Sequence, residues 1–356
     1  MTSSGIRFVG DATALAPLIR AGCTGWGIHD AEINLIKYRE NWVFKVTTGH
    51  DAYALRVHRP GYQTRASIET EMQMLHALAA AGMPVPQACP TVDGHHVQEL
   101  TGDDGTVHFV DLQRWVSDTV TLGDVVAAFR GVRTPPVAAI REIATLVAQV
   151  HSVLEEAVAD GRVDPRKRPR WDRAGLVGPA PLWGDPLRLL DTAEQRRIVS
   201  AALARIDARL AELGEHDDAF GLIHGDLTFE NVLLGPEGPV LIDFDDAGVG
   251  WHLFDLATTL VFLTTHPAYP TYEAAALDGY ASVRPITDAA RRAWPDLLVA
   301  RALTYLGWAA DRRGDEAARF LHEEFMPHVV GLAAHYLDDD RPRHIPVPAG
   351  EGAALP

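Results

Sequence analysis

Cysteine is scarce in this sequence. Only Cys23 and Cys89 occur among 356 residues, and neither belongs to a C-x-x-C pattern. This excludes a disulfide framework and a cysteine-based zinc site, and it makes a reducing compartment the default. The sequence does not open on a basic segment followed by an apolar stretch, so we expect no signal peptide and a cytoplasmic location. The most apolar run, 253–265, is interrupted by Asp255 and is too short to span a bilayer.

Positive charge is also in short supply. Lys and Arg number 32 against 48 Asp and Glu, which gives a formal net charge of −16. A chain this acidic, without a long basic run, is a poor binder of nucleic acid or of anionic membranes, and we expect neither as a partner. The basic cluster Arg166, Lys167, Arg168 and Arg170 is predicted to be a solvated loop. The acidic balance suits a neutral or cationic small substrate better.

The length and the order of expected elements indicate two lobes. At about 150 residues per domain, a chain of 356 residues favours two domains or one large composite fold. Short apolar and β-branched runs predict strands, and spaced apolar residues predict a helix between them. The expected order is strands at 33–38, 42–47 and 52–58, a helix at 64–81, and strands at 95–100 and 107–116.

Beyond this region the pattern is mostly helical. We expect helices at 136–158, 192–213, 252–265, 287–310 and 315–337, with one hairpin made by 232–234 and 240–242. The fold class is therefore α+β. We predict a small β-rich N-terminal lobe with one main helix at 1–112, a larger helical lobe at 113–338, and a loose tail at 339–356.

One stretch carries the residue types that phosphoryl transfer needs. Residues 222–246 read LIHGDLTFENVLLGPEGPVLIDFDD, with Asn231 five residues after Asp226 and Asp243 twelve residues after Asn231. The reaction requires a carboxylate that orients the attacking hydroxyl and accepts its proton, together with oxygen ligands for Mg²⁺. A hairpin between Asn231 and Asp243 returns the chain toward its starting point. This set predicts a catalytic carboxylate at Asp226 and metal ligands at Asn231 and Asp243.

The same residues carry a family resemblance. HGDLTFENVL followed by VLIDFDDAGVGWHLFDLA resembles the aminoglycoside phosphotransferase/choline kinase superfamily, which shares the bilobal fold of the protein kinases. Within it, the chain is most similar to the homoserine-kinase and stress-response-kinase branch. The resemblance runs from about Ile33 to Tyr336 and is strongest over 222–260. It implies an ATP- and Mg²⁺-dependent transfer of the γ-phosphate to a hydroxyl of a small molecule.

The resemblance also assigns roles. His224, Asp226 and Asn231 match the catalytic loop of the family, and Asp243 matches its metal-binding aspartate. Asp255 matches an aspartate that braces the catalytic loop from a helix. We expect His224 to be a buried residue that braces the loop rather than a proton carrier.

Two charged residues of the N-terminal lobe fit this interpretation. Kinase-like folds place a cation on the third strand to hold the nucleotide phosphates, and Arg56 occupies that place here. Its expected partner is Glu71 on the following helix, with Glu69 as the competing candidate. The alternative is that Arg56 and Glu71 are ordinary surface charges.

Nucleotide contacts beyond this pair are less defined by the sequence. No G-x-G-x-x-G follows the first strand, and the turn is Arg39-Glu40-Asn41 instead. Asn41 is predicted either to contact phosphate or to form part of a plain hairpin. The hinge between the lobes is predicted at Leu112–Val116, where Gln113 and Val116 are candidate neighbours of the adenine.

The sequence allows more than one role for several other residues and for the protein as a whole. His151 is expected in the core or as a brace of the catalytic loop, and Trp171 and Trp183 either line the substrate pocket or seal the helical lobe. The acceptor is undefined among aminoglycosides, amino alcohols, amino acids, sugars and protein. A Ser/Thr protein kinase of the stress-response type and a nucleotide-binding regulator with little activity are the alternative functions. The oligomeric state, monomer or homodimer, is not predicted.

Overall fold

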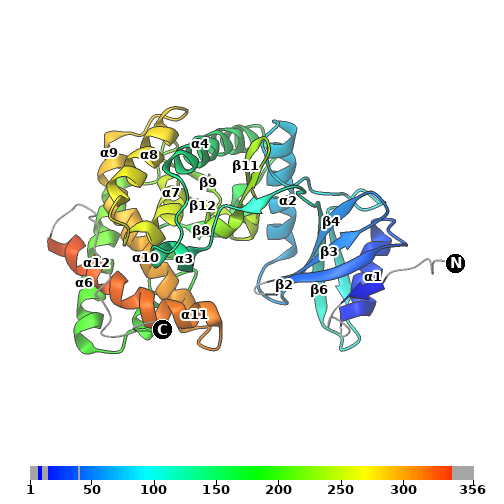
Figure 1. Ribbon diagram of the computed structural model, residues 1–356, viewed down its shortest axis with the longest axis horizontal. Helices are drawn as coiled ribbons and strands as arrows, with labels where there is room; N and C mark the ends of the chain where they lie inside the picture. The colour runs from blue at the N-terminus through cyan, green and yellow to red at the C-terminus, as the bar shows by residue number, and fades with distance from the viewer. Residues whose placement is uncertain (1–6, 10–14, 39–40, 339–356) are drawn as a thin grey trace. The chain divides into compact units, whose positions relative to one another are not determined.

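The computed structural model describes residues 7–9, 15–38 and 41–338 (Figure 1). The chain divides into two compact units, which we call the β-rich unit and the helical unit. The β-rich unit comprises 1–119, 156–168 and 240–245, and the helical unit comprises 120–155, 169–239 and 246–356. The domain boundaries expected from the sequence, 1–112 for one lobe and 113–338 for the other, stay predictions. The tail predicted at 339–356 lies outside the described residues.

The β-rich unit is built on a six-stranded sheet (Figure 1). Its order is β1 (Arg7–Val9), β2 (Glu32–Tyr38), β3 (Asn41–Thr47), β4 (Ala52–His58), β6 (Val107–Arg114) and β5 (Val97–Thr101). β1 pairs with β2 in parallel, and the other pairs are antiparallel. All five predicted strands are confirmed, whereas β1 was not predicted.

The two faces of this sheet differ in chemistry because side chains alternate along each strand. Leu55 and Val57 of β4 belong to the apolar core that α1 (Ala16–Gly25) completes with Leu18 and Ile19. Arg56, between those two strand residues, points to the opposite face. The sheet therefore presents an apolar face to α1 and a charged face to α2 (Arg65–Ala80), which was predicted at 64–81.

The helical unit contains most of the helices. They are α3 (Val125–Phe129), α4 (Val137–Ala159), α5 (Arg173–Val177), α6 (Ala193–Leu213), α7 (Leu253–Leu260), α8 (Tyr269–Ala281), α9 (Asp288–Arg292), α10 (Trp294–Ala310), α11 (Glu316–Phe320) and α12 (Met326–Asp338). α10 contacts α6, α7 and α12 and is buried along nearly its whole length. A helix that is apolar on all sides is expected in such a central position.

Three predicted helices are divided in the structure. The one predicted at 287–310 is split into α9 and α10, with Pro295 in the first turn of α10, where a proline without an N–H is tolerated. The one predicted at 315–337 has a π-helical turn at Leu321–Phe325 between α11 and α12. The one predicted at 252–265 consists of α7 and a 3₁₀ turn at Val261–Leu263.

Short strands position the candidate catalytic loop. β9 (Phe220–Ile223) pairs with β12 (Gly248–Trp251), which also pairs with β8 (Arg170–Trp171). The loop follows β9 and leads into β10 (Val232–Gly235), which pairs with β7 (Val120–Thr121). β10 and β11 (Gly238–Leu241) form the predicted hairpin. The loop is thus fixed at both ends by strand pairing.

Among the described residues, α4 alone is long and apolar enough to cross a membrane, and half of its most apolar window is buried in the protein. Buried core helices meet the same criterion.

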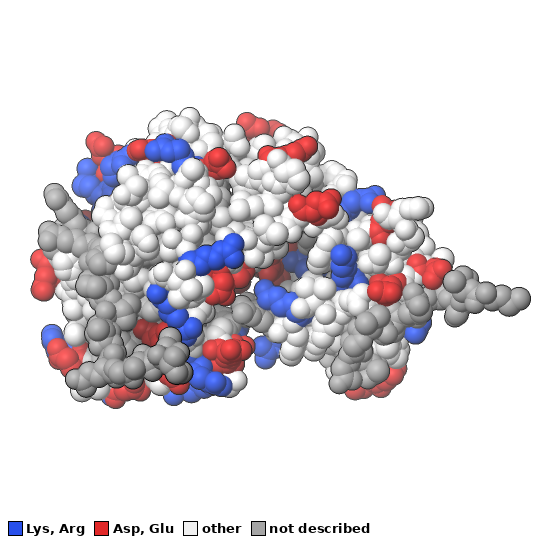
Figure 2. Space-filling view, viewed as in Figure 1, with Lys and Arg blue, Asp and Glu red and all other residues white. Residues whose placement is uncertain are grey.

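Acidic and basic side chains are interspersed on the face seen in Figure 2.

Candidate active site

Asp255 on α7 holds the start of the candidate catalytic loop. It is fully buried, and its two carboxylate oxygens accept the backbone N–H groups of His224 and Gly225, each at 2.8 Å. Nε2 of His151 lies 3.0 Å from the same carboxylate. Burial alone would raise the pKa of Asp255, but the hydrogen bonds from His151 and from the backbone N–H of His224 contribute to lowering it overall. The bracing roles predicted for Asp255 and His151 are confirmed.

His224 and Gly225 shape the turn that follows. His224 is buried, and its Nδ1 accepts the backbone N–H of Asp226 at 3.3 Å, which confirms its predicted bracing role. Gly225 has a φ of +81°, and a Cβ there would lie 2.8 Å from Nε1 of Trp171 and closer still to the carbonyl oxygen of Asp246. Only glycine fits this position.

Asp226 presents a partly exposed carboxylate, with 24% of its side chain accessible. Its Oδ1 accepts Nη2 of Arg301 at 2.6 Å and lies 3.4 Å from the hydroxyl of Tyr305. Its Oδ2 accepts Nδ2 of Asn231 at 3.2 Å. The carboxylate is therefore held on both oxygens while one side stays accessible.

Asn231 is oriented by two hydrogen bonds to Asp226. Its Nδ2 donates to the backbone oxygen of Asp226 at 2.8 Å as well as to the carboxylate. Because the amide nitrogen is used in this way, the amide oxygen faces away from Asp226. An amide oxygen of this kind is a ligand that Mg²⁺ accepts.

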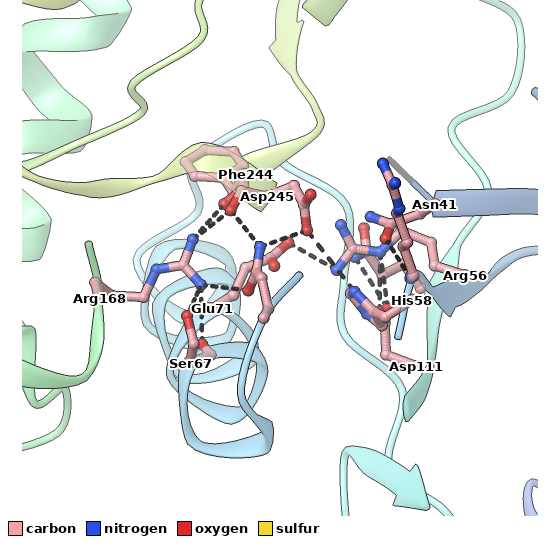
Figure 3. Close-up of polar contacts among 12 residues, drawn as sticks. Asn41, Arg56, His58, Ser67, Glu71, Asp111, Arg168, Phe244 and Asp245 are labelled. Carbon is pink, nitrogen blue, oxygen red and sulfur yellow. Dashed lines mark hydrogen bonds and ion pairs between the residues drawn. The ribbon is translucent and has the colours of Figure 1, made fainter. Parts of the chain in front are cut away.

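In the β-rich unit, Arg56 and Glu71 form the predicted ion pair (Figure 3). Nη2 of Arg56 lies 2.7 Å from Oε1 of Glu71, and the two side chains are 6% and 0% exposed. The alternative of two ordinary surface charges is therefore wrong. Glu69 is not the partner either, because it accepts a hydrogen bond from the exposed Arg65 at 2.8 Å.

Asp111 is a second partner of Arg56 that the sequence did not reveal. Nε of Arg56 donates to both oxygens of this buried carboxylate, at 2.9 and 3.2 Å. His58 lies 2.7 Å from it, and Nε2 of Gln113 donates to it at 3.2 Å. Strand alternation on β4 and β6 is the signal that would have found it, since Arg56 and Asp111 are paired across the ladder.

The two carboxylates around Arg56 respond differently to burial. Burial raises the pKa of Glu71 to about 7, even though Arg56 opposes the shift. Burial would also raise the pKa of Asp111, but Arg56 and the hydrogen bond from His58 lower it overall. Asp111 is thus the more firmly ionised counter-charge of Arg56.

Asp243 follows β11 in the β-rich unit, while Asp226 and Asn231 belong to the helical unit. Its φ of +65° is a left-handed conformation that a non-glycine residue seldom adopts, and such residues concentrate at functional sites. Its side chain is 36% exposed, with Oδ2 3.7 Å from Nζ of Lys37. In the part of the chain that the structure describes, no three His, Cys, Asp or Glu residues gather in a group that could hold a metal.

Arg168 fixes the segment that follows Asp243. Its guanidinium donates to the carbonyl oxygens of Phe244 at 3.1 Å and Asp245 at 2.7 Å, and to Ser67 of α2 at 2.9 Å (Figure 3). The prediction of a solvated loop for the basic cluster is wrong for Arg168, which is 4% exposed. The buried guanidinium ties the segment that follows Asp243 to α2.

Asn41 and Val116, two of the predicted nucleotide-binding residues, make few polar side-chain contacts among the described residues. Asn41 is buried at the start of β3, and its Oδ1 accepts the backbone N–H of Arg59 at 3.4 Å. The rest of its predicted turn, 39–40, lies outside the described residues. Val116 follows β6 and is half-buried. Their contacts with a nucleotide, like that of Gln113, stay predictions.

Arg301 and Tyr305 are site residues that the sequence reasoning missed. The two residues lie one turn apart on α10, and each contacts Asp226. The sequence does contain a signal that could have found Arg301: it is a single arginine inside the apolar segment LLVARALTYL. A charge in a buried helix needs a partner, so this arginine is expected to pair with a carboxylate. The irregular stretch at 162–186 contributes Trp171 and Trp183, whose rings lie 5.9 and 4.3 Å from the Arg301 guanidinium.

Comparison with known proteins agrees with this chemistry. The phosphotransferase enzyme family matches residues 37–294. The chain belongs to this family. A homoserine kinase of Pseudomonas aeruginosa is 30% identical over 73% of this chain and 74% of its own length. The resemblance found in the sequence is thereby confirmed, and the protein is a phosphotransferase.

Solved structures show the same fold. A microcompartment-associated aminopropanol kinase has a TM-score of 0.77 and 25% identity, covering 93% of this chain and 100% of its own. An amicoumacin kinase solved with AMP-PNP and Ca²⁺ has a TM-score of 0.65 and 18% identity, covering 84% of this chain and 88% of its own. The predicted α+β, protein-kinase-like fold is confirmed.

Proposed function

We propose that this phosphotransferase moves the γ-phosphate of ATP, with Mg²⁺, to a hydroxyl group of a small acceptor, and that Asp226 accepts the hydroxyl proton. The accessible, doubly anchored carboxylate of Asp226 carries the proposal. A base must meet the acceptor within hydrogen-bond distance, and Asp226 is fixed and open on one side. Little covalent chemistry is asked of the protein, since phosphoryl transfer depends on positioning and electrostatics.

The donor groups fit a nucleotide and a divalent cation. Nη1 of Arg56 is buried without a hydrogen-bond partner, although the rest of the guanidinium is held by Glu71 and Asp111. An unused N–H on a fixed cation suits a phosphate oxygen. The amide oxygen of Asn231 and the partly exposed carboxylate of Asp243 would bind Mg²⁺, which prefers few protein ligands and completes its shell with water and phosphate. Bound Mg²⁺ would neutralise charge on the phosphate oxygens.

We place the acceptor among small hydroxylated amines and amino acids. Named relatives act on homoserine and aminopropanol, each of which carries a hydroxyl on a short chain with an amino group. The net charge of −16 also favours a cationic acceptor such as an amine. We also place the protein in the cytoplasm, and both of its cysteines are free.

The test is ADP release over a panel of homoserine, aminopropanol, ethanolamine, choline and an aminoglycoside, with Mg²⁺ present and absent. We expect Mg²⁺-dependent turnover with at least one amino alcohol or hydroxy amino acid. Asp226→Asn is the blank, and its circular dichroism must match the parent because Asp226 is paired with Arg301. Label from γ-labelled ATP on protein rather than on the acceptor would contradict the proposal. Full turnover by Asp226→Asn would contradict the assignment of the base.

A further inference from the structure

The catalytic carboxylate is paired with a buried cation that comes from a distant helix. Nη2 of Arg301, on α10, lies 2.6 Å from Oδ1 of Asp226, and the Arg301 side chain is 0% exposed. The family match ends at residue 294, so Arg301 and its neighbour Tyr305 lie beyond the matched segment. In the described residues, Asp226 is the one carboxylate within ion-pair distance of Arg301.

Aromatic rings enclose the Arg301 guanidinium. The ring centroids of Trp183 and Tyr305 each lie 4.3 Å from it, that of Phe254 lies 5.3 Å away, and that of Trp171 lies 5.9 Å away. The two indoles are themselves anchored, since their Nε1 atoms donate to Asp246 at 3.3 and 2.9 Å. A cation over ring faces is attracted to them and is held in one orientation.

A second contact links Arg301 and Asp226. Nη2 of Arg301 also donates to the hydroxyl oxygen of Tyr305 at 2.8 Å, and that hydroxyl lies 3.4 Å from Oδ1 of Asp226. Oδ1 is therefore occupied by two donors. Nε and Nη1 of Arg301 have no hydrogen-bond partner, so the guanidinium makes its polar contacts through Nη2.

We propose that Arg301 is the positioning residue of this phosphotransferase: it holds Asp226 through Oδ1, so that Oδ2, which accepts one hydrogen bond from Asn231, keeps its second lone pair for the acceptor hydroxyl and takes its proton. The inference rests on the proposed role of Asp226. Burying an arginine in an apolar helix is costly, and an apolar residue in its place would often be as stable. A charge kept there serves orientation of its partner, because a carboxylate that rotates loses the geometry for proton acceptance.

The experiment compares Arg301→Gln, Asp226→Asn and the double variant in the full chain. In Arg301→Gln we expect kcat to fall about 100-fold, the loss that a misplaced catalytic group produces, with the KM for the acceptor little changed. In the Asp226→Asn background the same change should cost no further turnover, because residues that act as one unit are not additive. Arg301→Lys should recover part of kcat, since an ammonium restores the charge without the planar fork.

Arg205→Gln is the matched control. Arg205 also lies over an aromatic ring, that of Tyr336 at 4.8 Å, and donates to the carbonyl oxygens of Tyr336 and Leu337. We expect its kcat to equal that of the parent once corrected for the folded fraction. The positioning role would be overturned if the kcat of Arg301→Gln were also unchanged after this correction. It would likewise be overturned if Arg301→Gln reduced kcat by the same factor in the parent and in the Asp226→Asn variant.

A thermal cycle separates this inference from the proposed function. Asp226→Asn and Arg301→Gln should each lower Tm, and the double variant should be more stable than the sum of the two shifts predicts, because neither residue leaves its partner unpaired. Additive shifts would show that the pair does not exist and overturn the inference. A parent enzyme that turns over no acceptor, with the thermal coupling intact, would instead contradict the proposed function and with it the catalytic use of the pair.

Discussion

Asp111 receives the Nε–H of Arg56 on both of its carboxylate oxygens, at 2.9 and 3.2 Å, and both side chains are buried. Glu71 holds Nη2 of the same guanidinium at 2.7 Å. The predicted phosphate-binding cation is thus fixed between two carboxylates rather than one. An arginine can serve two partners in this way because its donors point along fixed directions in one plane.

Asp111→Asn should therefore destabilise the protein. The change leaves Arg56 with one buried counter-charge, and breaking a buried pair costs about 3 kcal/mol. Urea unfolding of the full chain measures the loss. Asp51→Asn is the control, because Asp51 pairs with Arg114 at 2.9 Å where both side chains are about half exposed, so its loss should be under about 1 kcal/mol. Equal losses in the two variants would refute the importance of burial here.

Glu71 should make the stability depend on pH. Burial raises its pKa to about 7 in the folded protein, against an unfolded value near 4.5, so the folded state binds the extra proton between these values. The contribution of Glu71 to stability is complete below pH 4.5 and is lost as the pH rises through 7. Glu71→Gln should remove this part of the slope. Thermal unfolding of the two proteins between pH 5 and about 7.5 measures it, and parallel curves would disprove the shift.

Arg168 should stabilise the segment around Asp243. Arg168→Gln removes donors to the carbonyl oxygens of Phe244 and Asp245 and leaves buried acceptors unsatisfied, at a cost of about 2 kcal/mol. We expect a higher Mg²⁺ concentration for half-maximal ADP release, since the segment carries the proposed ligand. The control is Arg166→Gln, from the same cluster, whose side chain is 85% exposed. A Mg²⁺ requirement that is the same in both variants would contradict the role of Arg168.

Asp255 should govern turnover through the loop that it holds. Asp255→Asn keeps one acceptor oxygen but not both, so one of the N–H groups of His224 and Gly225 loses its partner. We expect kcat to fall by about tenfold or more, because small displacements of a catalytic loop are costly. Asp278→Asn, at an exposed pair with Arg141 in the same unit, should leave kcat unchanged. Steady-state ADP release compares the two.

Much of the candidate site was accessible from sequence because its residues are close along the chain. Asp226 and Asn231 lie five residues apart in one loop, and their contact at 2.8 Å is local. The Arg56–Glu71 pair was also predictable, since the strand and the helix that carry them are consecutive predicted elements. Periodicity likewise gave the strands of the sheet and most of the helices. Where it predicted too long a helix, a proline, a π-helical turn or a 3₁₀ turn divides it.

By itself, then, the sequence determined the α+β fold class and the residues expected to perform phosphoryl transfer, because these depend on local pattern and spacing, and its motifs carried the resemblance that indicated the family. Only the tertiary structure showed that Asp111 shares Arg56, that Arg168 is buried, and that Arg301 holds Asp226. Arg301 lies 75 positions from Asp226 along the chain. Burial at such separations depends on how helices pack, and a single sequence does not specify which buried charge meets which partner.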